Sequence, residues 1–161
     1  MKKIFFLAAI LVPISLFAQN TVQGFFDKYA GHTGFTTVKI SPKMFDLIAS
    51  IEVDDTDLSA VKDITGVNVL VYEPASEKSN DLTDKLYAEA KTLITAGYEE
   101  LLSVIEEGTD IRIMAKSAGE GIVSDLLIVG KDDGEFIYVN IAGKMDMKKI
   151  SSMANDTDIK G

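Results

Sequence analysis

An apolar stripe with helical spacing follows position 20 and consists of Val22, Phe25, Phe26 and Tyr29. Asn20 or Thr21 can cap this segment and Gly31 can end it, so the pattern predicts an amphipathic helix over residues 21–30. A stripe of this kind usually packs into a core, because exposed apolar patches of that size endanger solubility. If it does not pack fully, the stripe offers a docking face for a partner.

The next segments alternate between strand and helix patterns. Residues 35–40 read as a strand, and Ser41 with Pro42 starts a helix through position 49, with a buried face predicted at Met44, Phe45 and Ile48. A short helix is predicted after Thr56 or Asp57, carrying Leu58, Val61 and Ile64. GVNVLVYE (66–73) is apolar on both faces, as an interior strand requires. Beyond the linker-like residues 75–81, a longer helix is predicted from Leu82, Leu86, Ala90, Leu93 and Ile94.

Residues 98–105 fit two structures. Apolar spacing allows the preceding helix to continue through them, whereas Gly97 favours a helix end and a new strand. We favour the strand, because EEGT (106–109) between two apolar runs is typical of a hairpin turn.

The remaining chain predicts a β-meander with strands at 110–116, 122–130 and 136–143. Asp133 and Gly134 form a pair that type I′ turns favour. Asp146 can cap a last helix that carries Met147, Ile150 and Met153. The predicted fold class is α+β: a largely antiparallel sheet of about six strands that ends in a β-meander, with helices mainly on one face. Strand order, and the direction of the second strand relative to the first, stay open.

Residues 1–18 have the pattern of an export signal. Lys2 and Lys3 precede an apolar stretch that is too short to span a bilayer, and Ala18 is a small residue before the expected cut. We therefore expect a single α+β domain over residues 19–161, located in the periplasm or secreted. The chain contains no cysteine, so we expect neither a lipoprotein nor disulfides.

Charge and hydropathy exclude two classes of partner. The formal charge of −9 becomes −11 when the two signal lysines are removed. Such a surface repels phosphate backbones and anionic lipids, so we expect no nucleic-acid partner. After the signal, no stretch is long and apolar enough for a transmembrane segment.

The single histidine, His32, lies in GHTG between the first predicted helix and strand. Serine catalysis needs a base and an orienting acid beside a nucleophilic serine, and the chain has no G-x-S-x-G motif to mark one. A zinc site needs further nitrogen or sulfur ligands, which a chain with one histidine and no cysteine does not supply. We interpret His32 as part of a connection.

Acidic residues are the other candidates for chemistry. Glu52, Asp54, Asp55 and Asp57 could bind a divalent cation, but the stretch lacks the central glycine of a calcium loop, so we interpret it as capping and solvation. The same interpretation applies to Asp132, Asp133 and Glu135 in KDDGE. With 25 acidic residues, paired carboxylates for glycoside cleavage are conceivable, yet no motif selects a pair. We assign no catalytic, metal or cofactor-binding residues and expect no cofactor.

Several segments together resemble a known family. They are FFDKYAG, GVNVLVYE, GYEELLSVIEEGTDIRIMAK and, most clearly, FIYVNIAGKMDMKKISSM, in which Met145 and Met147 flank Asp146. The chain resembles the domain of unknown function 4252, found in exported proteins of Bacteroidetes-type bacteria. The resemblance implies an envelope location and strengthens the strand interpretation of residues 98–105. It implies no catalytic residues.

These observations favour an uncharacterised envelope protein, a non-enzymatic domain that binds a protein partner or senses a signal. The first alternative is a carboxylate-dependent hydrolase acting on an envelope glycan. The second is a divalent-metal-binding module at residues 52–57. The sequence leaves the partner and the oligomeric state open.

Overall fold

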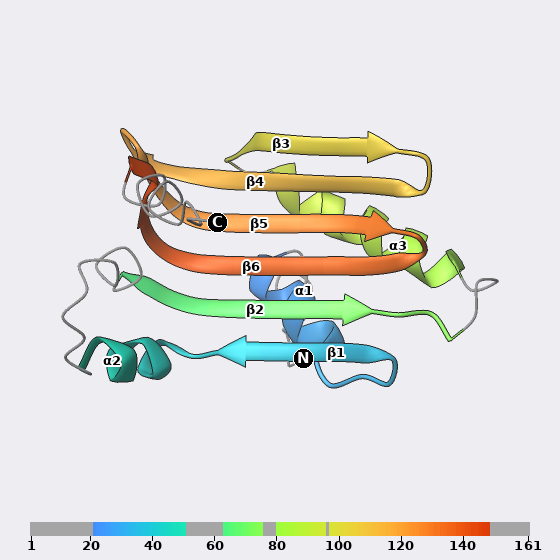
Figure 1. The fold of residues 1–161 in the computed structure, drawn as a ribbon, viewed down its shortest axis with the longest axis horizontal. Helices are drawn as coiled ribbons and strands as arrows, with labels where there is room; N and C mark the ends of the chain where they lie inside the picture. The colour runs from blue at the N-terminus through green and yellow to red at the C-terminus, as the bar shows by residue number, and fades with distance from the viewer. Residues whose placement is uncertain (1–20, 51–62, 76–79, 96, 149–161) are drawn as a thin grey trace, which may run out of the picture.

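In the computed structural model, the described residues form one six-stranded antiparallel sheet, with two helices packed on one of its faces and a third beyond the end of an edge strand (Figure 1). The structure describes residues 21–50, 63–75, 80–95 and 97–148. Its elements are α1 (Val22–Tyr29), β1 (Phe35–Ile40), α2 (Pro42–Ser50), β2 (Ile64–Tyr72), α3 (Asn80–Lys91), the 3₁₀ helix η2 (Thr92–Thr95), β3 (Tyr98–Glu106), β4 (Thr109–Gly119), β5 (Ile122–Asp132) and β6 (Glu135–Asp146). The strand order is β1-β2-β6-β5-β4-β3, so β1 and β3 form the two edges.

The predicted α+β class and β-meander are confirmed. β3 to β6 follow one another as antiparallel neighbours, and β2 pairs with β6 on their other side. β1 pairs antiparallel with β2, which answers the question of direction that the sequence left open. Residues 98–105 are a strand, as favoured, because Gly97, with φ of +80°, ends the preceding helix.

The turns form where the local chemistry predicts them. Asp133 and Gly134 connect β5 to β6 with φ angles of +47° and +87°, and a type I′ turn requires positive φ at both central positions. Glu106 pairs with Thr109 across the β3–β4 turn. Thr21 caps α1 by accepting a hydrogen bond of 2.9 Å from the backbone N–H of Gly24.

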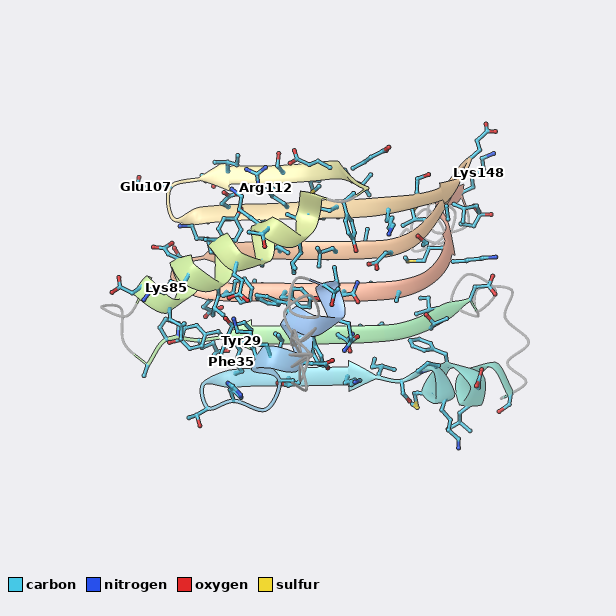
Figure 2. All side chains as sticks on the ribbon, turned by 180° about the vertical axis from the view of Figure 1, so that it is seen from behind. Tyr29, Phe35, Lys85, Glu107, Arg112 and Lys148 are labelled. Atoms are coloured by element: carbon cyan, nitrogen blue, oxygen red, sulfur yellow. The ribbon has the colours of Figure 1, made fainter. Side chains whose placement is uncertain are left out.

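α1 and α3 cover the same face of the sheet (Figures 1 and 2). The core lies between them and the strands, and its fully buried members include Phe25 and Phe26 of α1, Leu86 and Ala90 of α3, and Leu70, Leu127, Val129, Phe136 and Tyr138 of the sheet. Phe25 contacts Tyr138 and Phe136 with ring centroids 5.1 and 5.9 Å apart. The apolar stripe of the first helix is therefore core, and its use as a docking face is ruled out by burial.

On the opposite face of the sheet, apolar side chains lie next to one another from strand to strand. One row crosses all six strands in register through Val38, Val69, Val139, Ile128, Ile113 and Leu102. Its inner members are half-buried, and its two end members, Val38 and Leu102, are exposed. Neither α1 nor α3 lies on this face (Figure 1). The sheet thus has an apolar second face whose exposure is greatest at its edges.

The structure corrects three expectations. Met44, predicted in a buried face, has 48 % of its surface exposed, because α2 lies beyond the end of β1 instead of over the sheet (Figure 1). β4 and β6 extend further than predicted, to Gly119 and Asp146, and shorten the turn predicted at 117–121. Ile64, predicted on the acidic helix, is instead the first residue of β2, where it is in register with Gly143 of β6. Three predicted segments lie outside the described residues: the signal (1–18), the acidic helix up to residue 62 and most of the last helix. At its start, Asp146 accepts a hydrogen bond of 2.9 Å from the N–H of Lys148, as predicted for a cap.

Candidate functional site

The most exposed apolar part of the described structure is the edge strand β3. Its residues are exposed from Glu99 to Glu106, and four of them are large and apolar: Leu101, Leu102, Val104 and Ile105. Leu102 and Ile105 expose 52 % and 66 % of their surface. Apolar side chains clustered at such exposure are typical of surfaces that bind another molecule. We call residues 98–106 the β3 edge.

Apolar side chains of the β3 edge point to both faces of the sheet. Ile105 is in register with Asp110, whose carboxylate faces α3 through its contact with Arg112. Leu102 and Val104 are in register with Ile113 and Ile111, which lie on the opposite, apolar face. A partner that lies along the strand would therefore meet apolar groups on either side.

Arg112 of β4 fixes the position of the β3 edge from the helix side. Its guanidinium forms ion pairs with Glu100 at 3.0 Å and Asp110 at 3.3 Å, and its Nε donates to the hydroxyl of Tyr87 in α3 at 3.3 Å. Burial, with a contribution from Asp110, raises the pKa of Tyr87 to about 12, so this hydroxyl stays neutral. The contacts join α3, β4 and β3 beneath the exposed strand.

A small hollow of about 110 Å³ adjoins the far end of the β3 edge. It lies where β3, β4 and β5 meet and is lined by Glu99, Leu101, Ala115, Ser117, Gly119, Gly121, Ile122, Val123 and Met147. Glu99 is its one carboxylate. The hollow is smaller than sites for drug-sized ligands, which take roughly 300–1,000 Å³.

A second group of polar side chains surrounds Asp125 on the helix-bearing face. The buried amide of Asn140 donates a hydrogen bond of 2.5 Å to the carboxylate of Asp125, and the hydroxyl of Tyr98 also interacts with it. Burial raises the pKa of Asp125 above its ordinary value, although both hydrogen bonds and the nearby charge of Lys116 act in the opposite direction. The same burial, together with the charge of Asp125, raises the pKa of Tyr98.

The neighbours of Asp125 limit what this group can do. Its contacts are an amide, a phenol and an ammonium, and glycoside cleavage requires a second carboxylate at a defined separation. Among the described residues, no three histidine, aspartate or glutamate side chains gather as a metal site would require. The arrangement satisfies the buried amide of Asn140 and ties β5, β6 and β3 together, which is a structural role.

The described sequence-predicted candidates belong to two different connections of the fold. His32 is exposed in the connection between α1 and β1, where its backbone N–H donates to Tyr29 and its carbonyl accepts from Phe35, both at 3.1 Å. Asp132, Asp133 and Glu135 surround the β5–β6 turn, where Asp132 accepts a hydrogen bond from Thr109. The acidic cluster at 52–57 lies outside the described residues. Sequence reasoning did not identify the β3 edge, because its position at the rim depends on strand order.

Fold and surface together define a class: a small α+β domain with an open, antiparallel sheet and an exposed apolar edge strand. A family model described as "Domain of unknown function (DUF4252)" matches residues 29–153, and the chain belongs to this family. No curated protein and no solved structure matches the chain. Within the described residues, no helix has the length and apolar character needed to cross a membrane.

Proposed function

We propose that this chain is a non-enzymatic protein-interaction module, exported to the cell envelope, that binds a segment of another protein along the β3 edge. The observation that carries the proposal is the exposure of Leu101, Leu102, Val104 and Ile105 on one edge strand. Each apolar side chain left in water forgoes a contribution to stability. Burial of a cluster of such side chains by a partner is favourable, and an open strand edge beside the cluster gives the partner a place to bind.

The surroundings of the β3 edge support binding of a protein segment in preference to a small molecule. The adjoining hollow is small, whereas the strand itself is nine residues long and exposed along nearly its whole length. Protein interfaces are built on extended surfaces of this kind, with an apolar centre and a polar rim. Glu99, Glu100, Glu106 and Glu107 supply the polar rim.

Export is supported by the sequence of residues 1–18, with its lysines, short apolar stretch and small residue before the expected cut. We propose a periplasmic or secreted location on this basis. The hydrolase alternative gains no support from the described residues, because Glu99 is the one acid of the hollow and Asp125 has no carboxylate among its partners. The metal-binding alternative concerns residues that the structure does not describe.

The test uses a photoreactive amino acid in the full-length protein, produced in its own cells. It replaces Ser103, in the middle of the β3 edge, or Leu47 on α2, which is 57 % exposed and serves as the control position. We expect a specific crosslinked partner from position 103 and none from position 47. Competition by unmodified protein should remove the crosslink.

A matched pair of double variants then locates the binding surface. Leu102→Ser with Ile105→Ser removes apolar groups of the β3 edge, and Met44→Ser with Leu47→Ser removes groups of similar exposure from α2. We expect the first pair to abolish the crosslink and the second to retain it, with both variants folded by circular dichroism. Equal crosslinking by both variants, or no partner at position 103, would refute the proposed function.

A further inference from the structure

The backbone of the β3 edge is open on one side. β3 pairs with β4 along its length, and no described strand lies on its other side, so every second residue directs its N–H and C=O outward. An extended peptide can add to such an edge as a further strand, with main-chain hydrogen bonds giving affinity. This places a specific binding mode on the surface that we proposed above.

The opposite edge of the sheet is less suited to the same mode. β1 has six residues, and its exposed side chains are mostly polar or charged, with Lys39 near its end. Lysine and short length are common protections of edge strands against pairing. β3 is longer, and four of the five residues from Leu101 to Ile105 are apolar, with Ser103 the exception.

Acidic residues flank the apolar centre of β3 on both sides. Leu101–Ile105 lies between Glu99 and Glu100 at one end and Glu106 and Glu107 at the other. Glu100 is paired with Arg112, whereas the ion pairs of the described residues include none to the other three acids. Figure 2 shows Glu107 at the β3–β4 turn, at the opposite end of the sheet from Lys148.

This charge pattern disfavours a second copy of the chain as the occupant. Antiparallel pairing of two β3 strands over their apolar centres would set Glu99 against Glu107 and Glu100 against Glu106. Parallel pairing in register would set each glutamate beside its own equivalent. Like charges directly opposite each other destabilise a strand pair in either arrangement.

We propose that β3 accepts, by strand addition, an extended segment of a partner protein that has an apolar centre and basic residues at both ends. The inference rests on the proposed function and specifies its partner. The apolar centre of the segment meets Leu102, Val104 and Ile105, and its lysine or arginine side chains meet the flanking glutamates. The same glutamates then protect the free protein from pairing with itself.

The experiment measures binding of synthetic peptides to the full-length protein by fluorescence anisotropy. The probe has the length of β3, with alternating valine and threonine in the centre and paired lysines at both ends. One control peptide carries glutamates at the ends, and another carries N-methyl groups on every backbone nitrogen of its centre, so that neither of its edges can donate hydrogen bonds. We expect the lysine-flanked peptide to bind at least about tenfold more tightly than the glutamate-flanked one at low salt, since several exposed ion pairs contribute. N-methylation should abolish binding, because it removes main-chain donors.

A second experiment reverses charges on the protein and repeats the peptide measurements. Changing Glu99, Glu106 and Glu107 to lysine should invert the preference, so that the glutamate-flanked peptide binds more tightly. A control variant carries the same change at Asp46, Asp63 and Glu73, which are exposed and lie on the β1–β2 side of the sheet. It has the same net charge and should retain the preference for lysine.

Each contrary result has a distinct meaning. Equal binding of the lysine-flanked and glutamate-flanked peptides would refute the preference for basic ends. A preference that the control variant also inverts would refute it as well. Undiminished binding of the N-methylated peptide would overturn strand addition. A crosslinked partner at position 103 without any peptide binding would leave the proposed function standing and remove this inference. A dimer that the Leu102→Ser and Ile105→Ser changes dissociate would assign the edge to a second copy.

Discussion

The hydroxyl of Tyr138, in the middle of β6, donates a hydrogen bond of 2.8 Å to the backbone carbonyl of Val22 in the first turn of α1. The two residues are far apart in the sequence, and the Tyr138 side chain is fully buried. Burial raises the pKa of this phenol, so it remains a neutral donor. The bond fixes the start of the first helix on the central strands of the sheet.

Replacing Tyr138 with phenylalanine removes this bond and keeps the ring. We expect the free energy of unfolding to fall by about 1 kcal/mol, the usual net contribution of such a hydrogen bond. Urea unfolding followed by circular dichroism measures it, with an unchanged dependence on urea concentration as the check that the fold is intact. A variant as stable as the wild type would show that the bond contributes nothing.

The burial of Phe25 predicts a large effect of truncation. Phe25→Ala should lower the free energy of unfolding by about 3–5 kcal/mol, because it removes a fully buried ring that contacts Phe136 and Tyr138. The matched change Met44→Ala, at an exposed site of α2, should stay within about 0.5 kcal/mol of the wild type. Comparable losses for the two variants would contradict the placement of α1 over the core.

Gly143 is predicted to be irreplaceable because β2 approaches it closely. A Cβ atom at this position would collide with the carbonyl oxygen of Asp63 and would lie 2.5 Å from the Cα of Ile64, and the φ of Gly143 is +134°. Gly119 has a similar φ of +149° with nothing within 4 Å of such a Cβ. We expect Gly119→Ala to cost about 1 kcal/mol from backbone strain, and Gly143→Ala about 3 kcal/mol or more. The melting temperatures of the two variants measure these costs. The loss in Gly119→Ala gives the backbone strain alone, and the additional loss in Gly143→Ala gives the steric collision.

Asp125 predicts a pH dependence with a defined sign. Its folded-state pKa is raised by burial, so between the unfolded and folded pKa values the folded protein binds more protons than the unfolded chain. The contribution of Asp125 to stability is therefore present at low pH and is lost as the pH rises through the folded pKa. The Asp125→Asn variant has no carboxyl group to ionise at this position, so its stability does not fall in this way. Its stability relative to the wild type should therefore increase with pH and then level off.

Urea unfolding of both proteins between about pH 4 and about pH 7 tests this, because that range spans the ordinary aspartate pKa and values raised above it. Asp46→Asn removes one exposed carboxylate and controls for the change in net charge. If the stability of the Asp125 variant relative to the wild type instead fell as the pH rose, the folded protein would favour the charged carboxylate. That result would contradict burial as the dominant influence.

Local pattern predicted most elements of this fold. The stripe of Phe25 and Phe26 predicted the buried face of α1, and the Asp133–Gly134 pair predicted the type I′ turn. Even the choice between helix and strand at 98–105 depended on Gly97 and a turn signature, both local. These predictions succeeded because helix periodicity and turn conformation are set by residues close together in the chain.

By itself, then, the sequence determined the elements, the α+β class and the family, since each depends on short-range pattern. Only the tertiary structure decided that β3 lies at the edge, that Asp125 meets Asn140 and Tyr98, and that Met44 is exposed. Strand order sets all these relationships, and it is fixed by pairing between residues distant in sequence. An apolar run such as Leu101–Ile105 reads alike in a central strand and at an edge. Leu101–Ile105 is exposed because no described strand pairs with β3 on its outer side.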